Sequence, residues 1–306
     1  MQPDSAPSLD VLATGLRFPE GPIAMADGSV LLVEIARGTL SRVRDGSVEV
    51  VAELGGGPNG AAIGPDGHCY VCNNGGFEWL ERDGKLYPGE QPADYSGGRI
   101  ERVDLATGAV EVLYTECEGE PLKGPNDLVF DATGGFWFTD HGKSRERERD
   151  RTGVFYAAPD GRRIEEVLFP LEGPNGIGLS PAEDELYVAE TVPGRVWAYP
   201  LAAPGRVDTA QPRRLLVDRA GFHFFDSLAV DADGGVCVAT IIDGGITVLK
   251  PDGSEPHFVP MPDRLTTNIC FGGAELRTAY VTLSSIGQLV SLPWPTAGLA
   301  LNFLQR

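Results

Sequence analysis

The sequence is poor in basic residues and in histidine, and it contains no long apolar run. Among 306 residues, 25 Lys and Arg stand against 44 Asp and Glu, which gives a formal net charge of −19, and there are only 4 histidines. A negative surface repels nucleic-acid phosphates and anionic lipids. No apolar run approaches the ~20 residues that span a bilayer. We therefore expect neither nucleic acid nor a membrane as a partner.

Secretion signals and a disulfide framework are also missing. The segment Met1-Gln2-Pro3-Asp4-Ser5 lacks the basic and apolar regions of a signal peptide. The 5 cysteines are an odd number without a disulfide pattern. Cys69 and Cys72 have CxxC spacing, but residues i and i+3 of a strand face opposite sides, so buried thiols are expected rather than metal ligands. These features predict a cytoplasmic protein.

Glycine and proline are abundant instead, with 40 and 24 residues. Nearly every stretch of twelve residues contains one of them, which disfavours long helices and is typical of short strands joined by turns. The 42% hydrophobic content is enough to bury a large core. No shift in composition marks a domain boundary. We expect one all-β domain over residues 1–306, with residues 1–8 as a flexible N-terminal tail.

A repeated pattern organises the chain. Each repeat has a Gly/Pro-rich or bulky approach, one Asn, Asp or Glu (here called the anchor), a short apolar strand, a turn and a second strand. The anchors are Glu20, Asn59, Asn126, Asn175, Asp226 and Asn268, separated by 39, 67, 49, 51 and 42 residues. Propeller blades of about this length carry four strands each. Six repeats therefore predict a six-bladed β-propeller with four antiparallel strands per blade.

Two segments have expected places in this propeller. The second repeat is longer than the others because of residues 74–96, which we predict to be a long loop over the channel mouth, where propeller function usually lies. Residues 9–13 precede the first anchor and are predicted to form the outer strand of the last blade, which removes an exposed edge.

The anchors predict a cation site. Equivalent positions at the starts of six innermost strands would converge at one end of the channel axis, and the anchors are two carboxylates and four amides. Hard cations such as Ca²⁺ take six to eight oxygen ligands. The alternative for any single anchor is an Asx-turn that caps backbone donors. Glu20 does not suit that alternative, and clustered carboxylates without a cation would be costly.

The anchor motifs resemble those of the SMP-30/gluconolactonase/LRE family of six-bladed propellers. The resemblance covers about residues 15–295 and is carried by Phe18-Pro19-Glu20-Gly21-Pro22, Gly124-Pro125-Asn126-Asp127, Gly173-Pro174-Asn175-Gly176, residues 225–231, and Asn268-Ile269-Cys270-Phe271-Gly272-Gly273 with Tyr280-Val281-Thr282. It implies a catalytic divalent metal ion held by Glu20, Asn175 and Asp226.

The same resemblance assigns further roles. Asn126 would contact the substrate or complete the metal shell, and Asp226 would act as the base or orient the water. Animal sugar lactonases of the family carry Arg two residues before the substrate Asn, whereas this chain has Gly124. Related phosphotriesterase-type propellers use a similar Glu/Asn/Asn/Asp set, so the metal site alone does not separate the two chemistries.

Further substrate contacts are predicted at Asn59, Asn268, His141 and Trp79. Asp140 and His141 follow an expected strand and can lie near the channel mouth; the alternative is a turn Asp beside an exposed histidine. Ser227 can donate an oxygen to the metal or be an ordinary strand-start hydroxyl.

These features predict a divalent-metal-dependent lactone hydrolase acting on a small lactone or ester. Ca²⁺ is the expected ion, with Zn²⁺, Mn²⁺ and Mg²⁺ as alternatives. A metal polarises the ester carbonyl and activates water, while Asp226 takes a proton and Asn126 donates to the oxyanion. The alternative functions are a phosphotriesterase-like hydrolase and a non-enzymatic binding propeller. The oligomeric state is not readable from the sequence.

Overall fold

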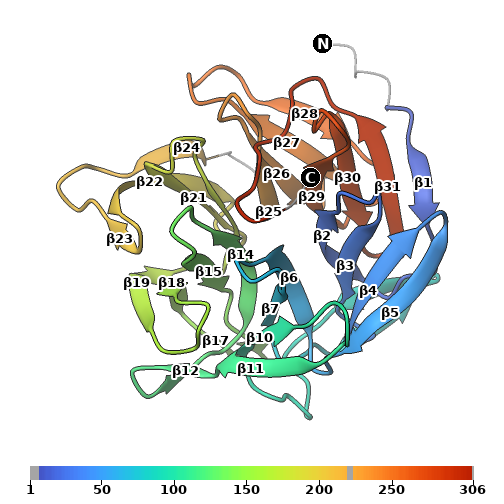
Figure 1. Ribbon diagram of the computed structural model, residues 1–306, viewed down its shortest axis with the longest axis horizontal. Helices are drawn as coiled ribbons and strands as arrows, with labels where there is room; N and C mark the ends of the chain where they lie inside the picture. The colour runs from blue at the N-terminus through green and yellow to red at the C-terminus, as the bar shows by residue number, and fades with distance from the viewer. Residues whose placement is uncertain (1–6, 219–222, 305–306) are drawn as a thin grey trace.

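The computed structural model describes residues 7–218 and 223–304. Within these ranges the regular structure is β-strand, and the main sheets surround a central axis as six blades (Figure 1). Residues 1–6 of the predicted N-terminal tail lie outside the described residues. A helix long and apolar enough to cross a membrane is not found in the described ranges.

Each of the first three blades is a four-stranded antiparallel sheet. Blade 1 comprises β2 (Pro19–Ala24), β3 (Val30–Glu34), β4 (Thr39–Arg44) and β5 (Ser47–Glu53). Blade 2 comprises β6 (Pro58–Ile63), β7 (Cys69–Asn73), β10 (Arg99–Val103) and β11 (Val110–Tyr114). Blade 3 comprises β14 (Pro125–Phe130), β15 (Phe136–Asp140), β18 (Thr152–Ala157) and β19 (Ile164–Leu171).

The other three blades repeat this arrangement with small variations. Blade 4 comprises β20 (Pro174–Leu179), β21 (Glu185–Glu190), β22 (Arg195–Ala203) and β24 (Arg214–Asp218), with β23 (Arg206–Val207) also paired to β22. Blade 5 comprises β25 (Phe224–Val230), β26 (Val236–Ile241), β27 (Gly245–Leu249) and β28 (His257–Pro260). Blade 6 comprises β29 (Thr266–Gly272), β30 (Thr278–Leu283), β31 (Gln288–Pro293) and β1 (Asp10–Ala13).

The ring is closed by strand β1, which pairs antiparallel with β31. The N-terminal and C-terminal parts of the chain therefore build one blade together, as predicted for residues 9–13. This closure pairs the edge of β31 that would otherwise be open to another chain. The predicted six-bladed propeller with four antiparallel strands per blade is confirmed.

The hydrophobic core lies between neighbouring blades rather than inside one of them. Leu31 and Val33 of blade 1 share a cluster with Cys69 and Val71 of blade 2. Cys72, on the opposite face of β7, belongs to the next cluster, between blades 2 and 3. Both thiols are fully buried, on opposite faces of the same strand. The prediction that the CxxC pair are buried thiols rather than metal ligands is therefore confirmed.

A register shift interrupts the innermost strand of every blade at or next to its anchor. Such bulges bend the strand and re-aim side chains. Adjacent inner strands also approach closely here, because a Cβ on Gly60 would lie 2.5 Å from the Asn126 carbonyl oxygen and one on Gly176 would lie 2.7 Å from that of Asp226. Glycine after these anchors permits the tight ring.

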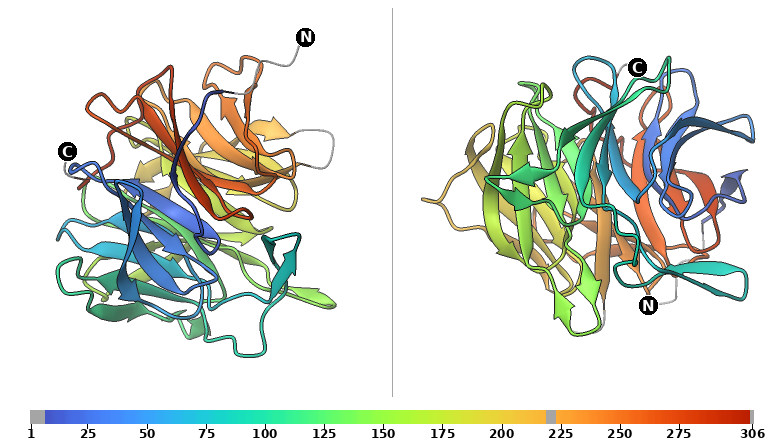
Figure 2. Two further views of the ribbon diagram at one scale, coloured as in Figure 1. Left: turned by 90° about the vertical axis from the view of Figure 1, so that its right-hand side faces the viewer. Right: turned by 90° about the horizontal axis from the view of Figure 1, so that it is seen from below.

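The two ends of the channel differ in what covers them. The short hairpins β8–β9 (Trp79–Arg82, Lys85–Pro88) and β16–β17 (Ser144–Arg145, Glu148–Arg149) project from one face, and the C-terminal segment lies on the other (Figure 2). The anchors lie at the face from which the two hairpins project, and this face is here called the anchor face. A third two-stranded ribbon joins β12 (Glu116–Cys117) and β13 (Glu120–Pro121).

Residues 74–96 are not a plain loop, because they contain the β8–β9 hairpin. The hairpin packs at the anchor face: the ring centroids of Trp79 and Phe18 are 5.1 Å apart, and the Leu86 amide donates to the Ser285 carbonyl at 3.0 Å. Strand formation satisfies backbone groups that an irregular loop of this length would leave to water.

Candidate functional site

The six anchors lie in a closed ring of innermost strands. Strand β2 contacts β6 and β29, β14 contacts β6 and β20, and β25 contacts β20 and β29. All the anchors except Asp226 are buried, and Asp226 is partly exposed. The tertiary structure therefore gathers at one end of the axis side chains that are up to 248 residues apart, such as Glu20 and Asn268.

Glu20 is held by neighbouring donors on both sides. Its Oε2 accepts hydrogen bonds from the Gly21 amide at 2.8 Å and from Asn268 Nδ2 at 2.7 Å. Asn268 Oδ1 accepts from the Ile269 amide at 2.8 Å, so both ends of this amide are engaged. Burial raises the pKa of Glu20 in spite of these bonds. In this structure Asn268 orients Glu20; its predicted substrate contact stays a prediction.

Asn175 and Asp226 face each other from blades 4 and 5. Asn175 Nδ2 donates to Thr191 Oγ1 at 3.2 Å, and Ser227 Oγ lies 3.4 Å from Asn175 Oδ1. Burial and the negative charge of Glu20 raise the pKa of Asp226 well above its ordinary value, although a hydrogen bond with Asn175 opposes the shift. Thr191 thus fixes the orientation of the Asn175 amide, whose Oδ1 accepts from the Ser227 hydroxyl.

A third carboxylate, Asp127, joins this cluster and was missed by the sequence analysis. It is buried, and burial followed by the charge of Glu20 raises its pKa to about 8. The repeat pattern predicts one axial residue per blade, but the bulge between Pro125 and Leu128 lets two successive residues turn inward. The available signal was the Asn126-Asp127 pair, where two other repeats have Asn followed by Gly.

The cluster fits a hard divalent cation in the chemistry of its donors. Asn126 Oδ1 is buried without a hydrogen-bond partner within the described residues. No Lys, Arg or His of the described ranges forms an ion pair with Glu20, Asp127 or Asp226. Unpaired buried carboxylates and an unsatisfied amide oxygen are costly unless a cation meets them.

Carboxylates alone do not make the site. In the part of the chain that the structure describes, no three His, Cys, Asp or Glu side chains form a metal-holding group by themselves. A cation bound here would also need amide oxygens beside Glu20 and Asp226, and Asn175 and Asn126 are the neighbouring residues that carry them. Asn59 occupies the equivalent buried position in blade 2.

Asp140 and His141 differ from the turn Asp and exposed histidine of the alternative interpretation. Asp140 is buried and accepts hydrogen bonds from the amides of Lys123, Gly124 and Gly142 at 2.7 to 2.9 Å. It therefore caps the backbone that leads to Asn126. This role is structural, and it positions a predicted catalytic residue from the end of the neighbouring strand.

His141 lies beside the approach to Asn175. Its Nε2 is 2.8 Å from Arg149 Nη2, and a Cβ on Gly173 would come within 3.1 Å of the ring. Burial, followed by the positive charges of Arg149 and Lys143, lowers the pKa of His141 to about 3. The imidazole is therefore neutral at working pH, and since Arg149 can only donate, Nε2 accepts.

Lys143 ties the β8–β9 segment to blade 3. Its fully buried Nζ donates to Asn74 Oδ1 at 3.1 Å and to the Gly76 carbonyl, and it lies 4.1 Å from the centroid of the Phe77 ring and 5.5 Å from that of Tyr95. No carboxylate pairs with the ammonium group within the described residues. Burial lowers its pKa to about 7, while Asp140 and Asp150 act in the opposite direction.

This buried amine predicts a pH-dependent stability. Above about pH 7 folded Lys143 releases a proton that the unfolded chain keeps until about 10.5, so the free energy of unfolding contributed by this group rises with pH in that window. Between pH 7 and 9 the wild type should gain about 2 kcal/mol relative to Lys143→Met. Urea unfolding of both proteins at the two pH values measures the gain. Equal pH dependence in both would refute the shift.

Comparison with known proteins identifies the family to which the chain is similar. A family model described as the SMP-30/Gluconolactonase/LRE-like region matches residues 18–285. A gluconolactonase of Zymomonas mobilis is 26% identical over 298 residues, covering 88% of this chain and 77% of that protein. Lactonase drp35 of Staphylococcus saprophyticus is 29% identical over 262 residues, covering 84% and 74%. The solved structure of the calcium-binding protein regucalcin from Agrobacterium tumefaciens has a TM-score of 0.77 at 20% identity and covers 98% of each chain, so it shares the fold.

Proposed function

The chain belongs to the SMP-30/Gluconolactonase/LRE-like family, and from that membership we propose that it hydrolyses lactones at the anchor face. Relatives that are named gluconolactonase and lactonase, each matched over more than four fifths of this chain, support the reaction class. We propose that the reaction depends on a divalent cation held by Glu20, Asn175 and Asp226, with Asn126 beside them.

The observation that carries the cation proposal is the unsatisfied cluster itself. Burial and the charge of Glu20 raise the pKa values of Asp127 and Asp226, burial raises that of Glu20 itself, and the buried Oδ1 of Asn126 has no partner within the described ranges. Ca²⁺ suits a site made of carboxylate and amide oxygens without a thiolate or an imidazole. The regucalcin neighbour contributes only the fold at its level of identity, so the choice of calcium rests on the donors.

The residues divide the work of ester hydrolysis among them. A bound cation would act as a Lewis acid toward the carbonyl oxygen and offset the repulsion among the carboxylates. Asp226, the most exposed anchor, accepts a proton from the attacking water. The amide of Asn126 donates to the oxyanion that forms at the carbonyl. The ring C–O bond then breaks, Asp226 returns the proton to the alkoxide oxygen that leaves, and the product is a hydroxy acid.

Residues around the mouth hold the substrate. Trp79 packs against Phe18, which precedes Glu20 by two residues in the sequence, and the two rings form an apolar surface beside Glu20. Neutral His141 lies near Asn175 on another side of the ring. Asn59 completes the predicted contacts from blade 2. A small cyclic ester of mixed polarity is the substrate class that these groups suit.

A panel assay tests the proposal. The purified protein with Ca²⁺ is given glucono-δ-lactone, δ-valerolactone, dihydrocoumarin and the organophosphate paraoxon, and spontaneous hydrolysis is subtracted from each rate. Saturable hydrolysis of at least one lactone is expected. Hydrolysis of paraoxon alone would replace the proposal by a phosphotriesterase function, and the absence of any hydrolysis would favour a binding propeller.

A further inference from the structure

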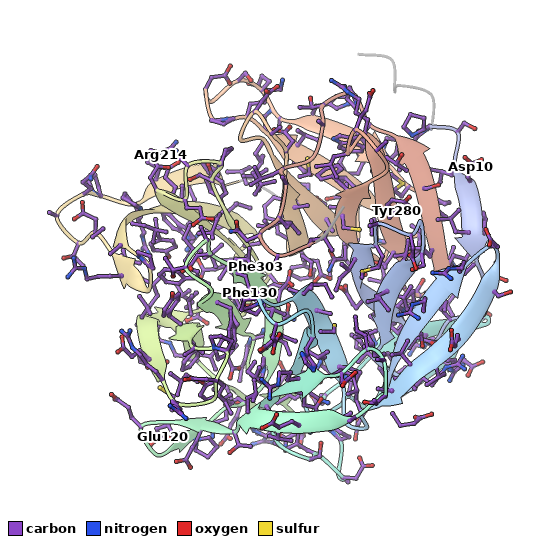
Figure 3. All side chains as sticks on the ribbon, viewed as in Figure 1. Asp10, Glu120, Phe130, Arg214, Tyr280 and Phe303 are labelled. Carbon is purple, nitrogen blue, oxygen red and sulfur yellow. The ribbon has the colours of Figure 1, made fainter. Side chains whose placement is uncertain are left out.

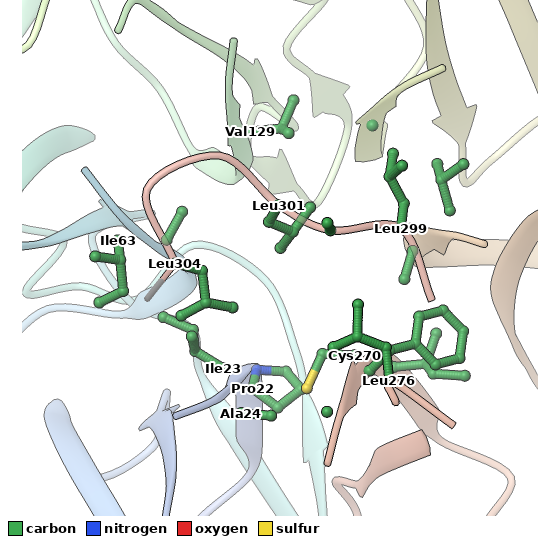
Figure 4. Close-up of a pocket in the computed structure, with 18 of the residues that line it drawn as sticks. Pro22, Ile23, Ala24, Ile63, Val129, Cys270, Leu276, Leu299, Leu301 and Leu304 are labelled. Atoms are coloured by element: carbon green, nitrogen blue, oxygen red, sulfur yellow. The ribbon is translucent and has the colours of Figure 1, made fainter. Parts of the chain in front are cut away.

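The two sides of the anchor ring differ in charge. Behind the ring, on the side away from the anchor face, lies a channel cavity of about 680 Å³, and Leu301 of the C-terminal segment lines its outer end (Figure 4). The segment is attached there by an edge-on contact of Phe303 with Phe130, whose ring centroids are 6.1 Å apart (Figure 3). The charged residues among those that line this cavity, Asp127 and Glu183, are both acidic. A negatively charged ligand is therefore disfavoured on this side.

The anchor face, in contrast, carries basic side chains on blade 3. The segment between β15 and β18, which contains the β16–β17 hairpin, supplies Lys143, Arg145 and Arg149 among others. Lys143 is enclosed by the residues that lead to the β8–β9 hairpin, as described above, and Arg145 forms an ion pair with Asp150. Arg149 differs from both, because it is neither fully enclosed nor paired with a carboxylate within the described residues.

Arg149 lies beside the approach to Asn175. Its Nη2 is 2.8 Å from His141 Nε2, and its Nη1 donates to Ser144 Oγ at 3.2 Å. A Cβ placed on Gly173 would collide with Nη2. Because Gly173 precedes Asn175 by two residues, the guanidinium group stands next to the start of the innermost strand of blade 4. It therefore lies where a substrate bound at the anchors can meet it.

The guanidinium group of Arg149 is short of both acceptors and counter-charge. In the part of the chain that the structure describes, two of its five N–H donors have acceptors, and its buried Nε has none. The two nearby carboxylates are already engaged, since Glu172 pairs with Arg151 at 3.3 Å and Asp150 pairs with Arg145. Burial lowers the pKa of Arg149, while the charges of Glu172 and Asp150 act in the opposite direction. A partly buried cation in this state is stabilised by an anion that binds to it.

The hairpin that carries Arg149 is fixed in place before any ligand binds. At its base the Asp150 amide donates to the Lys143 carbonyl at 3.0 Å, and the Lys143 amide donates to Asp150 Oδ2 at 3.0 Å. On its other side the Gln91 amide donates to the Ser144 carbonyl at 2.9 Å. A donor that is held in position loses less conformational entropy on binding than a mobile one.

We propose that Arg149 determines substrate specificity by binding a carboxylate, so that the preferred lactones carry a carboxylate group in addition to the ring ester. The inference rests on the proposed function, since the ester is still opened at the anchors. The two Nη groups of an arginine match the two oxygens of a carboxylate. In a chain with a net charge of −19, such a local cation is what an anionic substrate requires.

A matched pair of substrates tests the proposal in the Ca²⁺-loaded protein. The lactone 5-oxotetrahydrofuran-2-carboxylate and its primary amide have nearly the same shape and differ by one charge. We expect the wild type to prefer the carboxylate by about tenfold in kcat/KM, mainly through KM, as the loss of one charge-assisted contact predicts. Arg149→Met should remove most of this preference. The matched control Arg147→Met makes the same change at the exposed turn of the hairpin and should keep the wild-type preference.

The ratio of the two kcat/KM values separates recognition from support. If Arg149 only braces His141, Arg149→Met lowers turnover of both substrates equally and the ratio stays, which overturns the proposal. Arg149→Lys keeps the charge without the planar fork, and it should retain part of the preference if Arg149→Met does not fold. A wild type that treats the carboxylate and the amide alike also overturns the proposal, and this measurement needs no variant.

A binding measurement distinguishes failure of this inference from failure of the proposed function. Calorimetric titration of the Ca²⁺-loaded wild type compares glutarate with glutaramate, its monoamide, and requires no turnover. Tighter binding of glutarate, lost in Arg149→Met, supports the carboxylate site even if neither lactone is hydrolysed, in which case only the proposed function fails. Hydrolysis of lactones with equal binding of the two acids leaves the proposed function standing and overturns the role of Arg149.

Discussion

Replacing Asp226 with alanine is expected to lower kcat/KM for lactone hydrolysis about a thousandfold, within the range that a positioned general base contributes. Asp226 is the partly exposed anchor, and its carboxylate belongs to the cluster of Glu20 and Asp127. Removing it takes away both a proton acceptor and one of the two anchor carboxylates. Steady-state kinetics on the best lactone of the panel measure the loss.

The control for this prediction is a matched change far from the anchors. Asp252→Ala removes an exposed carboxylate in the turn after β27 and should leave turnover unchanged. The metal-free Asp226→Ala protein should also be at least as stable as the wild type, since the change removes a carboxylate that is repelled by the charges of Glu20 and Asp127. Undiminished turnover in Asp226→Ala would contradict the assigned role.

Chelation is expected to abolish lactone hydrolysis and to lower the midpoint of thermal unfolding by several degrees. Without a cation, burial raises the pKa of Glu20, and burial together with the charge of Glu20 raises the pKa values of Asp127 and Asp226. A ligand that binds only the folded state stabilises it by about 4 kcal/mol at a thousand times its dissociation constant. Activity assays and calorimetry before and after addition of EDTA, and after return of Ca²⁺, measure both effects.

Glu20→Gln separates cation binding from general damage. The substitution keeps the shape of Glu20 and its contact with Asn268, but it removes the charge that raises the pKa values of Asp127 and Asp226. The metal-free variant should therefore unfold at or above the temperature of the metal-free wild type, and Ca²⁺ should no longer raise that temperature. If the chelated wild type keeps its turnover, or if the variant gains the same thermal shift, the metal proposal fails.

Much of the fold was predictable because each blade is specified by short sequence patterns, and these patterns recur six times along the chain. Alternating apolar residues, turns rich in Gly and Asp, and the anchor recurring six times each report on a short stretch of chain. The position of β1 followed from the need to close the ring, and its pairing with β31 confirms this. The six anchors were identifiable because equivalent positions in blades share one location, whereas the choice of Glu20, Asn175 and Asp226 as metal ligands came from the family resemblance and stays a prediction.

Other features were not predictable because they depend on contacts between distant segments. The segment from Trp79 to Pro88 was expected to be a loop. It forms a hairpin whose strands pair only with each other and whose packing partners lie in blades 1 and 6, so nothing in its own stretch of sequence indicated the structure. Lys143 carried no signal, because an isolated lysine in a charged stretch is normally solvated. It is buried here only because residues 74–77 fold over it.

The sequence by itself determined the architecture and which oxygen-bearing residues recur at the anchor positions, because periodicity, turn residues and the anchors are local properties. Only the tertiary structure decided which side chains share the axis. The bulge after Pro125 turns Asp127 inward beside Asn126, and burial raises the pKa of Asp127 to about 8. Likewise, the channel cavity behind the ring exists only because several inner strands and the C-terminal segment meet there. Desolvation and mutual repulsion arise when folding brings groups together, and no single stretch of sequence contains them.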